Sequence, residues 1–392
     1  MMTSRERMER AMRPREGRLP DRVPVMCQLA LGHYFLHAGD PIEIWHDSEA
    51  FAEALLTLRA RYRFDGILVN LPGRNPAWRR HLLETGREPR GQVLRWSDGR
   101  RTIVPPDDNP RPGDATVPVR FADLDPDGLY YIEPHDIGGL SFPTRWSFER
   151  SPAIPGAGFF PPWHWDTLRL VRRAAPDVSV HGEVFSPFSQ WMELLGCTEG
   201  LLALMRDPGK VEACLDRLSD GATELACGHL EAGADAVLIS SAYAGAGFIS
   251  PAHYRRFVLP FEARLITRVR ARFPGAVIYT HTCGAIGDRL ELLEESGTLG
   301  IDTLDPPPLG TVDLADARRR LGTRVFIKGN VDPVNTVLSG TADACFADAR
   351  ARLAVARPGG GYILSTACSV PPHAPAENVL ALARAADVEG NY

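Results

Sequence analysis

The chain has 392 residues, 44% of them hydrophobic and 24% charged, which is the composition of an ordinary globular protein. A formal net charge of -5, with no basic block interleaved with aromatics, excludes nucleic acid as the main partner. No run approaches the roughly 18 apolar residues that span a bilayer, and seven scattered cysteines are typical of reduced thiols, so we expect a cytoplasmic protein without a membrane segment.

The first predicted element is a helix near the N-terminus. Residues 4–22 read "SRERMERAMRPREGRLPDR", which is rich in arginine but contains nearly as many acids in its first turns. A basic tail that binds nucleic acid would lack those acids. We therefore predict a helix that faces solvent.

Short apolar runs alternate with longer helical patterns through most of the chain. Two candidate strands, 23–31 and 66–71, have a helical pattern at 48–63 between them. Six more follow, with helical patterns at 251–272, 285–296, 312–321 and 341–356: these strands are 178–184, 236–240, 276–281, 300–305, 324–330 and 362–367. Strands of this length alternating with helices indicate βαβ units and a parallel sheet.

Eight strands are the number that closes a (β/α)8 barrel, or TIM barrel. A doubly wound open sheet is the alternative, but no glycine-rich GxGxxG turn follows the first strand. The sequence contains no repeat and no low-complexity linker. We therefore predict a single TIM-barrel domain that spans residues 1–392.

The alternation breaks at residues 85–160, which are dense in proline, glycine and aspartate. Within them, "GQVLRWSDGRRTIVP" reads as a strand, a turn at "SDG" and a second strand. We expect an insertion after the second strand that contains a β-hairpin and lies over the catalytic face.

Three soft ligands fall where predicted strands end. His281 closes the fifth strand, Cys283 lies two residues later, and Cys368 lies two residues past Thr366 at the end of the eighth strand. In a barrel these positions meet at the C-terminal face, where active sites are built. One imidazole and two sulfurs suit zinc and leave a fourth position for substrate. The competing interpretation is a buried cysteine and a histidine that caps a strand.

Several stretches resemble the uroporphyrinogen decarboxylase superfamily. They include "RERMERAM" with "DRVPV" near the N-terminus, "LMRDPGKV" at 204–211, "KGNVDP" at 328–333 and "GGGYILSTACSVPPHAPAENV" at 359–379. The resemblance covers nearly the whole chain and implies a (β/α)8 barrel, in agreement with the strand count.

The decarboxylase branch of that superfamily differs at positions that bind its substrate. Its arginine-rich "RQAGRY"-type loop after the first strand is "QLALGHYF" here (28–35), without arginine. Its aspartate after the second strand is missing from "LVNLPG" (68–73), and its "GHG" histidine after the last strand is replaced by "ACS", which contains Cys368. A porphyrinogen would lose the counter-charges of its carboxylates, and an unpaired buried carboxylate costs roughly several kcal/mol.

The other branch contains zinc-dependent methyltransferases that pass a methyl group between a corrinoid and a thiol such as coenzyme M. Its signature is HxC followed some eighty residues later by one cysteine, and His281, Cys283 and Cys368 match it one by one. The resemblance implies a catalytic Zn²⁺, a corrinoid that a partner protein carries, and a small-molecule thiol or methylated substrate.

Further residues are candidates for lining the active site at the C-terminal face of the barrel. Glu183 ends the third strand, where it is a candidate catalytic base, a fourth zinc ligand or the partner of an arginine. Gln28, His33 and Tyr34 follow the first strand and are candidates for substrate binding, with core or capping roles as the alternative.

Two later loops contribute the remaining candidates. Tyr243, in "SSAYAGAG", is placed to contact substrate or to pack its own loop, and Asn330 is placed to bind substrate or, with Asp332, to fix a turn. His373, in "PPHAP", reads as part of a rigid surface turn, so we leave it out of the metal site.

The sequence therefore predicts a zinc-dependent methyltransferase, active as a monomer or homodimer. Its acceptor is coenzyme M, another small thiol or tetrahydrofolate, and its donor is a corrinoid or a small methylated metabolite. The diverged first loop and the insertion leave open a zinc-dependent lyase or decarboxylase of a non-porphyrin small molecule. A carrier or sensor that binds a corrinoid or metal without turnover is the third alternative.

Overall fold

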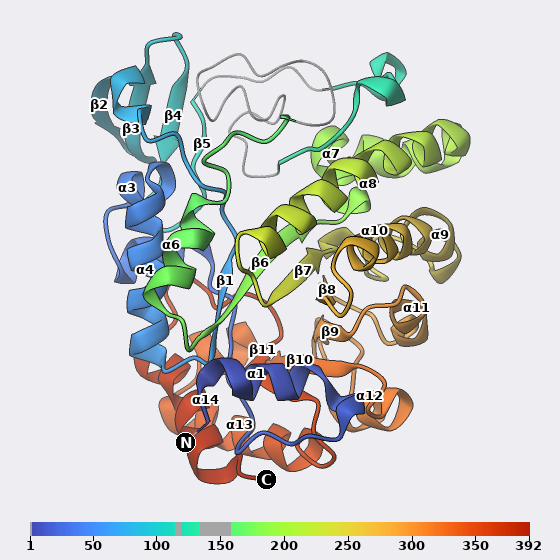
Figure 1. Ribbon diagram of the computed structural model, residues 1–392. Helices are drawn as coiled ribbons and strands as arrows, with labels where there is room; N and C mark the ends of the chain where they lie inside the picture. Colours follow the sequence, from blue (N-terminus) through green and yellow to red (C-terminus); the bar gives the residue numbers. More distant parts are fainter. Residues whose placement is uncertain (1, 114–118, 134–157) are drawn as a thin grey trace.

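A curled parallel sheet organises the protein in the computed structural model, which describes residues 2–113, 119–133 and 158–392 (Figure 1). The sheet has seven strands in the order β1-β6-β7-β8-β9-β10-β11, each parallel to its neighbours. These strands are β1 (Gly66–Val69), β6 (Ser179–Phe185), β7 (Ala236–Ser240), β8 (Val277–Thr282), β9 (Gly300–Thr303), β10 (Phe326–Val331) and β11 (Tyr362–Thr366). Their side chains are buried almost throughout, as expected for strands covered on both faces.

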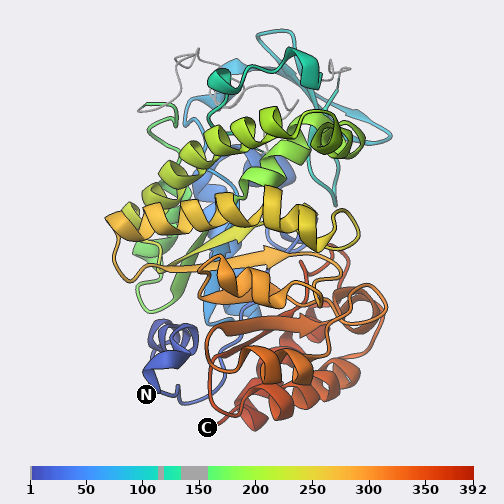
Figure 2. The ribbon, with the colours of Figure 1, turned by 90° about the vertical axis from the view of Figure 1, so that its right-hand side faces the viewer.

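Helices cover the outside of this sheet and follow one another in chain order, which Figure 2 shows from the side. They are α2 (Leu31–His37), α3 (Pro41–His46), α4 (Ser48–Tyr62), α6 (Asp166–Ala174), α7 (Pro187–Arg206), α8 (Pro208–Glu231), α9 (Pro251–Phe257), α10 (Leu259–Arg272), α11 (Leu290–Glu295), α12 (Leu314–Leu321), α13 (Ala342–Ala356) and α14 (Ala376–Glu389). Across the described residues, none of the helices combines the length and the apolar character that crossing a bilayer requires.

The first predicted strand, 23–31, does not form a continuous strand. Val25 and Leu29 make only isolated parallel bridges, to Leu364 and Val370. Pro24 has no amide hydrogen to donate, which interrupts any ladder at that point. The segment still lies between β11 and β1, because the Met26 amide donates to Leu364 and the carbonyl of Val25 accepts from the Asp65 amide.

Two other predicted boundaries were wrong. The helix expected at 251–272 divides into α9 and α10 at Val258, because Pro260 cannot donate an amide hydrogen to a continuous helix. The helix expected at 285–296 begins only at Leu290. The remaining predicted strands and helices match the structure within a few residues.

Helix α1 (Ser4–Met12) is not the solvent-facing helix that we expected. Met8, Ala11 and Met12 are buried in the apolar cluster that fills the inside of the curled sheet. Arg7 is also buried and pairs with Asp65 just before β1, at 2.7 Å. One face of α1 therefore covers the N-terminal ends of the strands, and only the other face meets water.

A second sheet lies between β1 and β6 in the chain. It is antiparallel, in the order β2-β3-β4-β5, and consists of β2 (Leu82–Glu88), β3 (Gly91–Trp96), β4 (Arg101–Val104) and β5 (Arg111–Pro112). Figures 1 and 2 place it at one end of the molecule and the two chain termini at the other. The predicted insertion at 85–160 also includes 114–118 and 134–157, which lie outside the described residues, so its position over the catalytic face stays a prediction.

Candidate metal centre

The three predicted metal ligands converge at the C-terminal ends of β8 and β11. The Nε2 atom of His281 lies 3.3 Å from the sulfur of Cys283 and 4.0 Å from that of Cys368, and the two sulfurs lie 3.8 Å apart. His281 is buried inside the sheet near the end of β8, and both cysteines are half-buried in the loops that follow β8 and β11. Residues 85 positions apart in the chain thus form one compact cluster.

The spacing of these donor atoms fits a zinc ion. Zn–S bonds of about 2.3 Å and Zn–N bonds of about 2.0–2.1 Å at tetrahedral angles place two sulfurs about 3.8 Å apart, and a sulfur and a nitrogen about 3.6 Å apart. The observed separations bracket those values. Three such donors leave one tetrahedral position for a further ligand.

Asp302 orients the imidazole of His281. Its carboxylate accepts a hydrogen bond from Nδ1 of His281 at 3.1 Å, and a carboxylate only accepts, so Nδ1 carries a proton and Nε2 is the nitrogen that faces the cysteines. The ammonium of Lys328 donates to both oxygens of Asp302, at 2.9 and 3.1 Å. All three side chains are buried, so Lys328 supplies the counter-charge that keeps this carboxylate ionised.

Asp305 places a second carboxylate beside the cluster. Its Oδ2 atom accepts from the amide of Gly284, the residue after Cys283, at 2.6 Å. Its Oδ1 atom is buried and has no hydrogen-bond partner. Burial raises the pKa of Asp305, and the neighbouring sulfur of Cys368 raises it further. The carboxylate therefore has one oxygen available to a bound cation or proton donor.

The cluster is electrostatically poised to exchange protons for a cation. Burial lowers the pKa of His281, but Asp302 and Cys368 outweigh it and raise the value to about 10. The hydrogen bond between the two sulfurs lowers the pKa of Cys368 and raises that of Cys283. Without a metal, a thiolate at Cys368 thus faces a protonated imidazole, and a divalent cation would displace the protons.

Buried polar groups behind the cluster hold the loop after β7. The amide of Ser241 donates to the carbonyl of His281 at 2.7 Å, and its hydroxyl donates to the carboxylate of Glu262 at 2.6 Å. Gly245 follows in the same loop, where an added Cβ would lie 2.4 Å from the carbonyl oxygen of Cys283. Glycine at this position therefore lets the two loops approach closely.

Glu183 lies on β6 but outside this cluster. The donor atoms of the three ligands lie within 4.8 Å of one another, and no other histidine, cysteine or acid of the described residues joins them. Glu183 is buried, and its carbonyl oxygen accepts from Nε2 of His229 at 3.0 Å. Its role as a catalytic group stays a prediction.

The residues predicted after the first strand occupy different environments. His33 is fully buried, with one ring nitrogen 2.9 Å from the carbonyl of Pro371 and the other 2.7 Å from the hydroxyl of Tyr62. Tyr34 is buried edge-on against Phe51 in the helical layer. These contacts are those expected for a core role, and substrate binding by either residue stays a prediction. Gln28, in contrast, is half-buried, and its Oε1 atom has no hydrogen-bond partner.

The later candidates are also engaged by protein groups. The hydroxyl of Tyr243 donates to Glu193 at 2.5 Å. Asn330 donates to the carbonyl of Leu304 at 2.8 Å and accepts from Arg352 of α13, so both ends of its amide are used inside the fold. Whether either residue contacts substrate stays a prediction.

Asp332 and His373 have structural contacts. Asp332 accepts from the amides of Val334 and Asn335 at 2.8 Å each, as expected for a residue that fixes a turn. His373 is exposed and lies 2.8 Å from Asp107, away from the ligand cluster.

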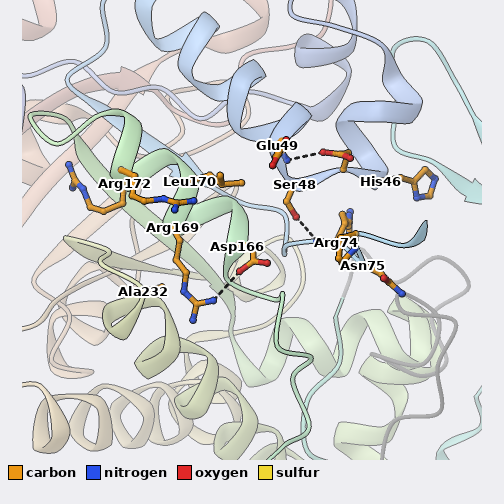
Figure 3. Close-up of a pocket in the computed structure, with 13 residues that line it drawn as sticks. His46, Ser48, Glu49, Arg74, Asn75, Asp166, Arg169, Leu170, Arg172 and Ala232 are labelled. Carbon is orange, nitrogen blue, oxygen red and sulfur yellow. Dashed lines mark hydrogen bonds and ion pairs between the residues drawn. The ribbon is translucent and has the colours of Figure 1, made fainter. Parts of the chain in front are cut away.

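A cavity of about 730 Å³ lies elsewhere, between the start of α4, the loop after β1 and α6 (Figure 3). Two of its arginines have acidic partners: Arg169 points toward Asp166 at 3.0 Å, and Arg172 pairs with Asp235, which does not line the cavity. It is lined by His46, Asp47, Ser48, Glu49, Arg74, Asn75, Pro76, Asp166, Arg169, Leu170, Arg172, Arg173 and Ala232. None of the three metal ligands lines this cavity, so it is separate from the candidate metal centre.

Sequence reasoning missed Asp302, Asp305 and Lys328. The signal was present, because "GIDTLD" and "RVFIKGN" each place charged residues in otherwise apolar strands. A buried charge is costly unless it is paired, so two neighbouring buried strands with opposite charges predict an ion pair between them.

Comparison with known proteins places the chain among relatives of two activities. The family model for uroporphyrinogen decarboxylase (URO-D) matches residues 155–388. A uroporphyrinogen decarboxylase from Picosynechococcus sp. is 32% identical over 174 residues, which cover 44% of this chain and 46% of the relative. The methylcobamide:CoM methyltransferase MtaA from Methanosarcina barkeri is 26% identical over 223 residues, which cover 57% of this chain and 62% of the relative. The chain thus matches about half of the length of these curated relatives.

A solved methyltransferase from Methanosarcina mazei has the same fold over the whole chain, with a TM-score of 0.70, 20% identity and 99% coverage of both chains. The URO-D match covers more than half of this chain, and the relatives include the methyltransferase branch that the three ligands indicated. The chain therefore belongs to the uroporphyrinogen decarboxylase family.

Proposed function

We propose that this protein is a zinc-dependent methyltransferase, which moves a methyl group between a corrinoid and a small thiol. The convergence of His281, Cys283 and Cys368 carries the proposal. The methyltransferase relative supports it, since methylcobamide and CoM stand in the name of that relative.

Zinc bound at this cluster would lower the pKa of a coordinating thiol and hold its sulfur in place. His281, Cys283 and Cys368 would be its protein ligands. Asp302 keeps the proton of His281 on Nδ1, and Lys328 balances the charge of Asp302. The side chains around the cluster thus fix the orientation and charge of the ligands before any substrate arrives.

The proposed reaction is a displacement at carbon. The thiol sulfur forms a bond to the methyl carbon while the cobalt–carbon bond breaks, and both electrons of that bond remain on cobalt. The thiol proton is released, so a thiol and methylcobalt(III) become a thioether, cobalt(I) and a proton. Because Asp305 has an unpartnered oxygen beside the cluster, we propose it as the first acceptor of that proton.

Porphyrinogen decarboxylation is less well supported. Residues 28–35 contain no arginine, and residues 68–73 contain no acid, so the groups that the decarboxylase branch uses are missing from both segments. A lyase or decarboxylase that acts on another small molecule is the second candidate, and it would release its product without any corrinoid.

We further propose that residues 23–29 take the place of the eighth strand and close the sheet. The protein would then be a (β/α)8 barrel in one domain. The hydrogen bonds of this segment to β11 and to Asp65 support closure. We also propose the insertion at 85–160 as the part of the chain that contacts a corrinoid protein. All seven cysteines are unpaired, which supports the proposed cytoplasmic location.

The test is methyl transfer in solution. Zinc-loaded protein is incubated with methylcobalamin and a thiol, and the change of the cobalamin spectrum is followed over time. We expect turnover in the wild type and none in Cys368→Ala, while Cys345→Ala, which replaces a buried cysteine of α13, remains active. Product release without corrinoid, or equal rates in both variants, would contradict the proposal.

A further inference from the structure

The inside of the curled sheet changes from apolar to polar toward the metal cluster. Side chains that point inward from the 23–29 segment, β1 and β11 belong to one buried apolar cluster: Met26, Leu68 and Ile363. Side chains of extended segments alternate between the two faces, so residues two positions later face the same way. Gln28, Asn70 and Ser365 therefore form the next layer, nearer to the strand ends.

Each residue of this layer has a polar atom without a partner. Oε1 of Gln28, Oδ1 of Asn70 and Oγ of Ser365 are all buried and unbonded. The segments that carry them are neighbours, because the 23–29 segment bonds to β11 on one side and to Asp65, just before β1, on the other. A buried polar atom without a partner is rare and needs an explanation. Three such atoms on adjacent segments indicate a place where a bound molecule supplies the missing hydrogen-bond partners.

The charges around the metal cluster are mainly negative. Carboxylates that act on the cluster or on its neighbours include those of Glu193, Asp302, Asp305 and Asp332, and that of Glu183 acts on Tyr279 together with Asp302. The ammonium of Lys328 lies beside these carboxylates and is already bound to Asp302. An anionic head group would therefore meet repulsion from these carboxylates, and the ammonium of Lys328 is not free to bind it.

We propose that the substrate bound beside the metal ligands carries an uncharged or positively charged hydrogen-bonding head, such as a hydroxyl or an ammonium, and not a carboxylate or sulfonate. This inference rests on the proposed function, because it names the class of thiol that the same site accepts. Neutral amides and a hydroxyl satisfy such a head without a counter-charge. A sulfonate or carboxylate is normally held by arginine or lysine.

Three matched thiols test the inference. Cysteamine, 2-mercaptoethanol and 2-mercaptoethanesulfonate share a two-carbon chain and differ only in an ammonium, a hydroxyl or a sulfonate. Their Kd values for the zinc-loaded protein are measured by isothermal titration calorimetry. We expect the first two to bind at least about tenfold more tightly than the sulfonate, which corresponds to about 1.4 kcal/mol. Equal or tighter binding of the sulfonate overturns the inference.

Variants of Gln28 and Asn70 test whether the polar layer causes the head-group preference. Gln28→Glu keeps the shape of the side chain and adds a negative charge, so we expect tighter cysteamine binding and weaker sulfonate binding. Gln28→Ala and Asn70→Ala should each weaken 2-mercaptoethanol several-fold, whereas Gln92→Ala, on β3, should leave all three Kd values unchanged. Zinc content is measured for every variant, and unchanged Kd values in all Gln28 and Asn70 variants would contradict the inference.

The same experiment separates this inference from the proposed function. Binding in the expected order without methyl transfer supports the head-group preference and contradicts the methyltransferase proposal. Methyl transfer with a preference for the sulfonate contradicts the head-group preference alone.

Discussion

Replacing Asp302 with asparagine tests how the protein would prepare His281, the proposed histidine ligand of zinc. Asp302 is 1% exposed, and its carboxylate binds Nδ1 of His281, the ammonium of Lys328 and the amide of Thr303. Asparagine has nearly the same shape but no charge, and half of its amide group donates. The variant therefore loses the group that fixes the tautomer of His281.

Two separate losses are expected. Removing a partner of a metal-bound histidine typically lowers metal affinity by about 10–100-fold, which corresponds to about 1.4–2.7 kcal/mol. The ammonium of Lys328, only 2% exposed, would also be left without its counter-ion, which costs about 3–5 kcal/mol of folding free energy. The double variant Asp302→Asn/Lys328→Met removes the unpaired charge, so it should recover stability but not zinc affinity.

The assay combines zinc competition against a chromophoric chelator with urea unfolding. Asp235→Asn is the matched control, because Asp235 pairs with Arg172 at the opposite end of the sheet. That variant should lose stability and keep its zinc affinity. The reasoning is refuted if folded Asp302→Asn binds zinc as tightly as the wild type, or if the double variant regains full affinity.

Three further outcomes follow from the structure. Gly245→Ala should lower zinc affinity by displacing Cys283. Gly247→Ala, in the same loop, should leave zinc affinity unchanged because an added Cβ there meets nothing within 4 Å. Equal zinc affinities of the two variants would contradict the close contact between Gly245 and Cys283. Burial raises the pKa of Glu262 from 4.5 to about 7. At a pH between these two values, Glu262 is protonated in the folded protein and ionised in the unfolded chain. Stability should therefore fall by about 3 kcal/mol as pH rises from about 4.5 to 7. Glu262→Gln, which still accepts from the Ser241 hydroxyl, should abolish that slope in urea unfolding at pH 5 and 8; an unchanged slope would assign it to other groups. Chelation of zinc should lower Tm, because free zinc at about 1,000 times its Kd contributes about 4 kcal/mol, and an unchanged Tm would exclude binding of that strength.

Much of the parallel sheet could be predicted because its strands are short, apolar and separated by helical patterns. The order of elements then placed His281, Cys283 and Cys368 at one face before their distances were known. The 23–29 segment misled the prediction because its apolar pattern is that of a strand, whereas its pairing depends on the missing amide hydrogen of Pro24.

Pairing across strands was harder to predict. Asp302 and Lys328 look like isolated charges in apolar runs, and only the register of β9 with β10 makes them direct partners. Asn330 and Gln28 are both amides predicted near strand ends, and the sequence does not distinguish them. In the structure, both ends of the Asn330 amide are hydrogen-bonded within the fold, whereas the side-chain oxygen of Gln28 has no partner. Sequence pattern identifies which residues reach the strand ends, and three-dimensional contacts decide which of them are free to bind.

X-ray absorption at the zinc edge of the purified protein, with and without a thiol, tests the central claim most directly. We predict one nitrogen and two sulfur ligands at about 2.0–2.1 and 2.3 Å together with a lighter fourth donor, and a third sulfur once the thiol is added. A protein that holds no stoichiometric zinc, or a zinc coordinated only by nitrogen and oxygen, would contradict the account.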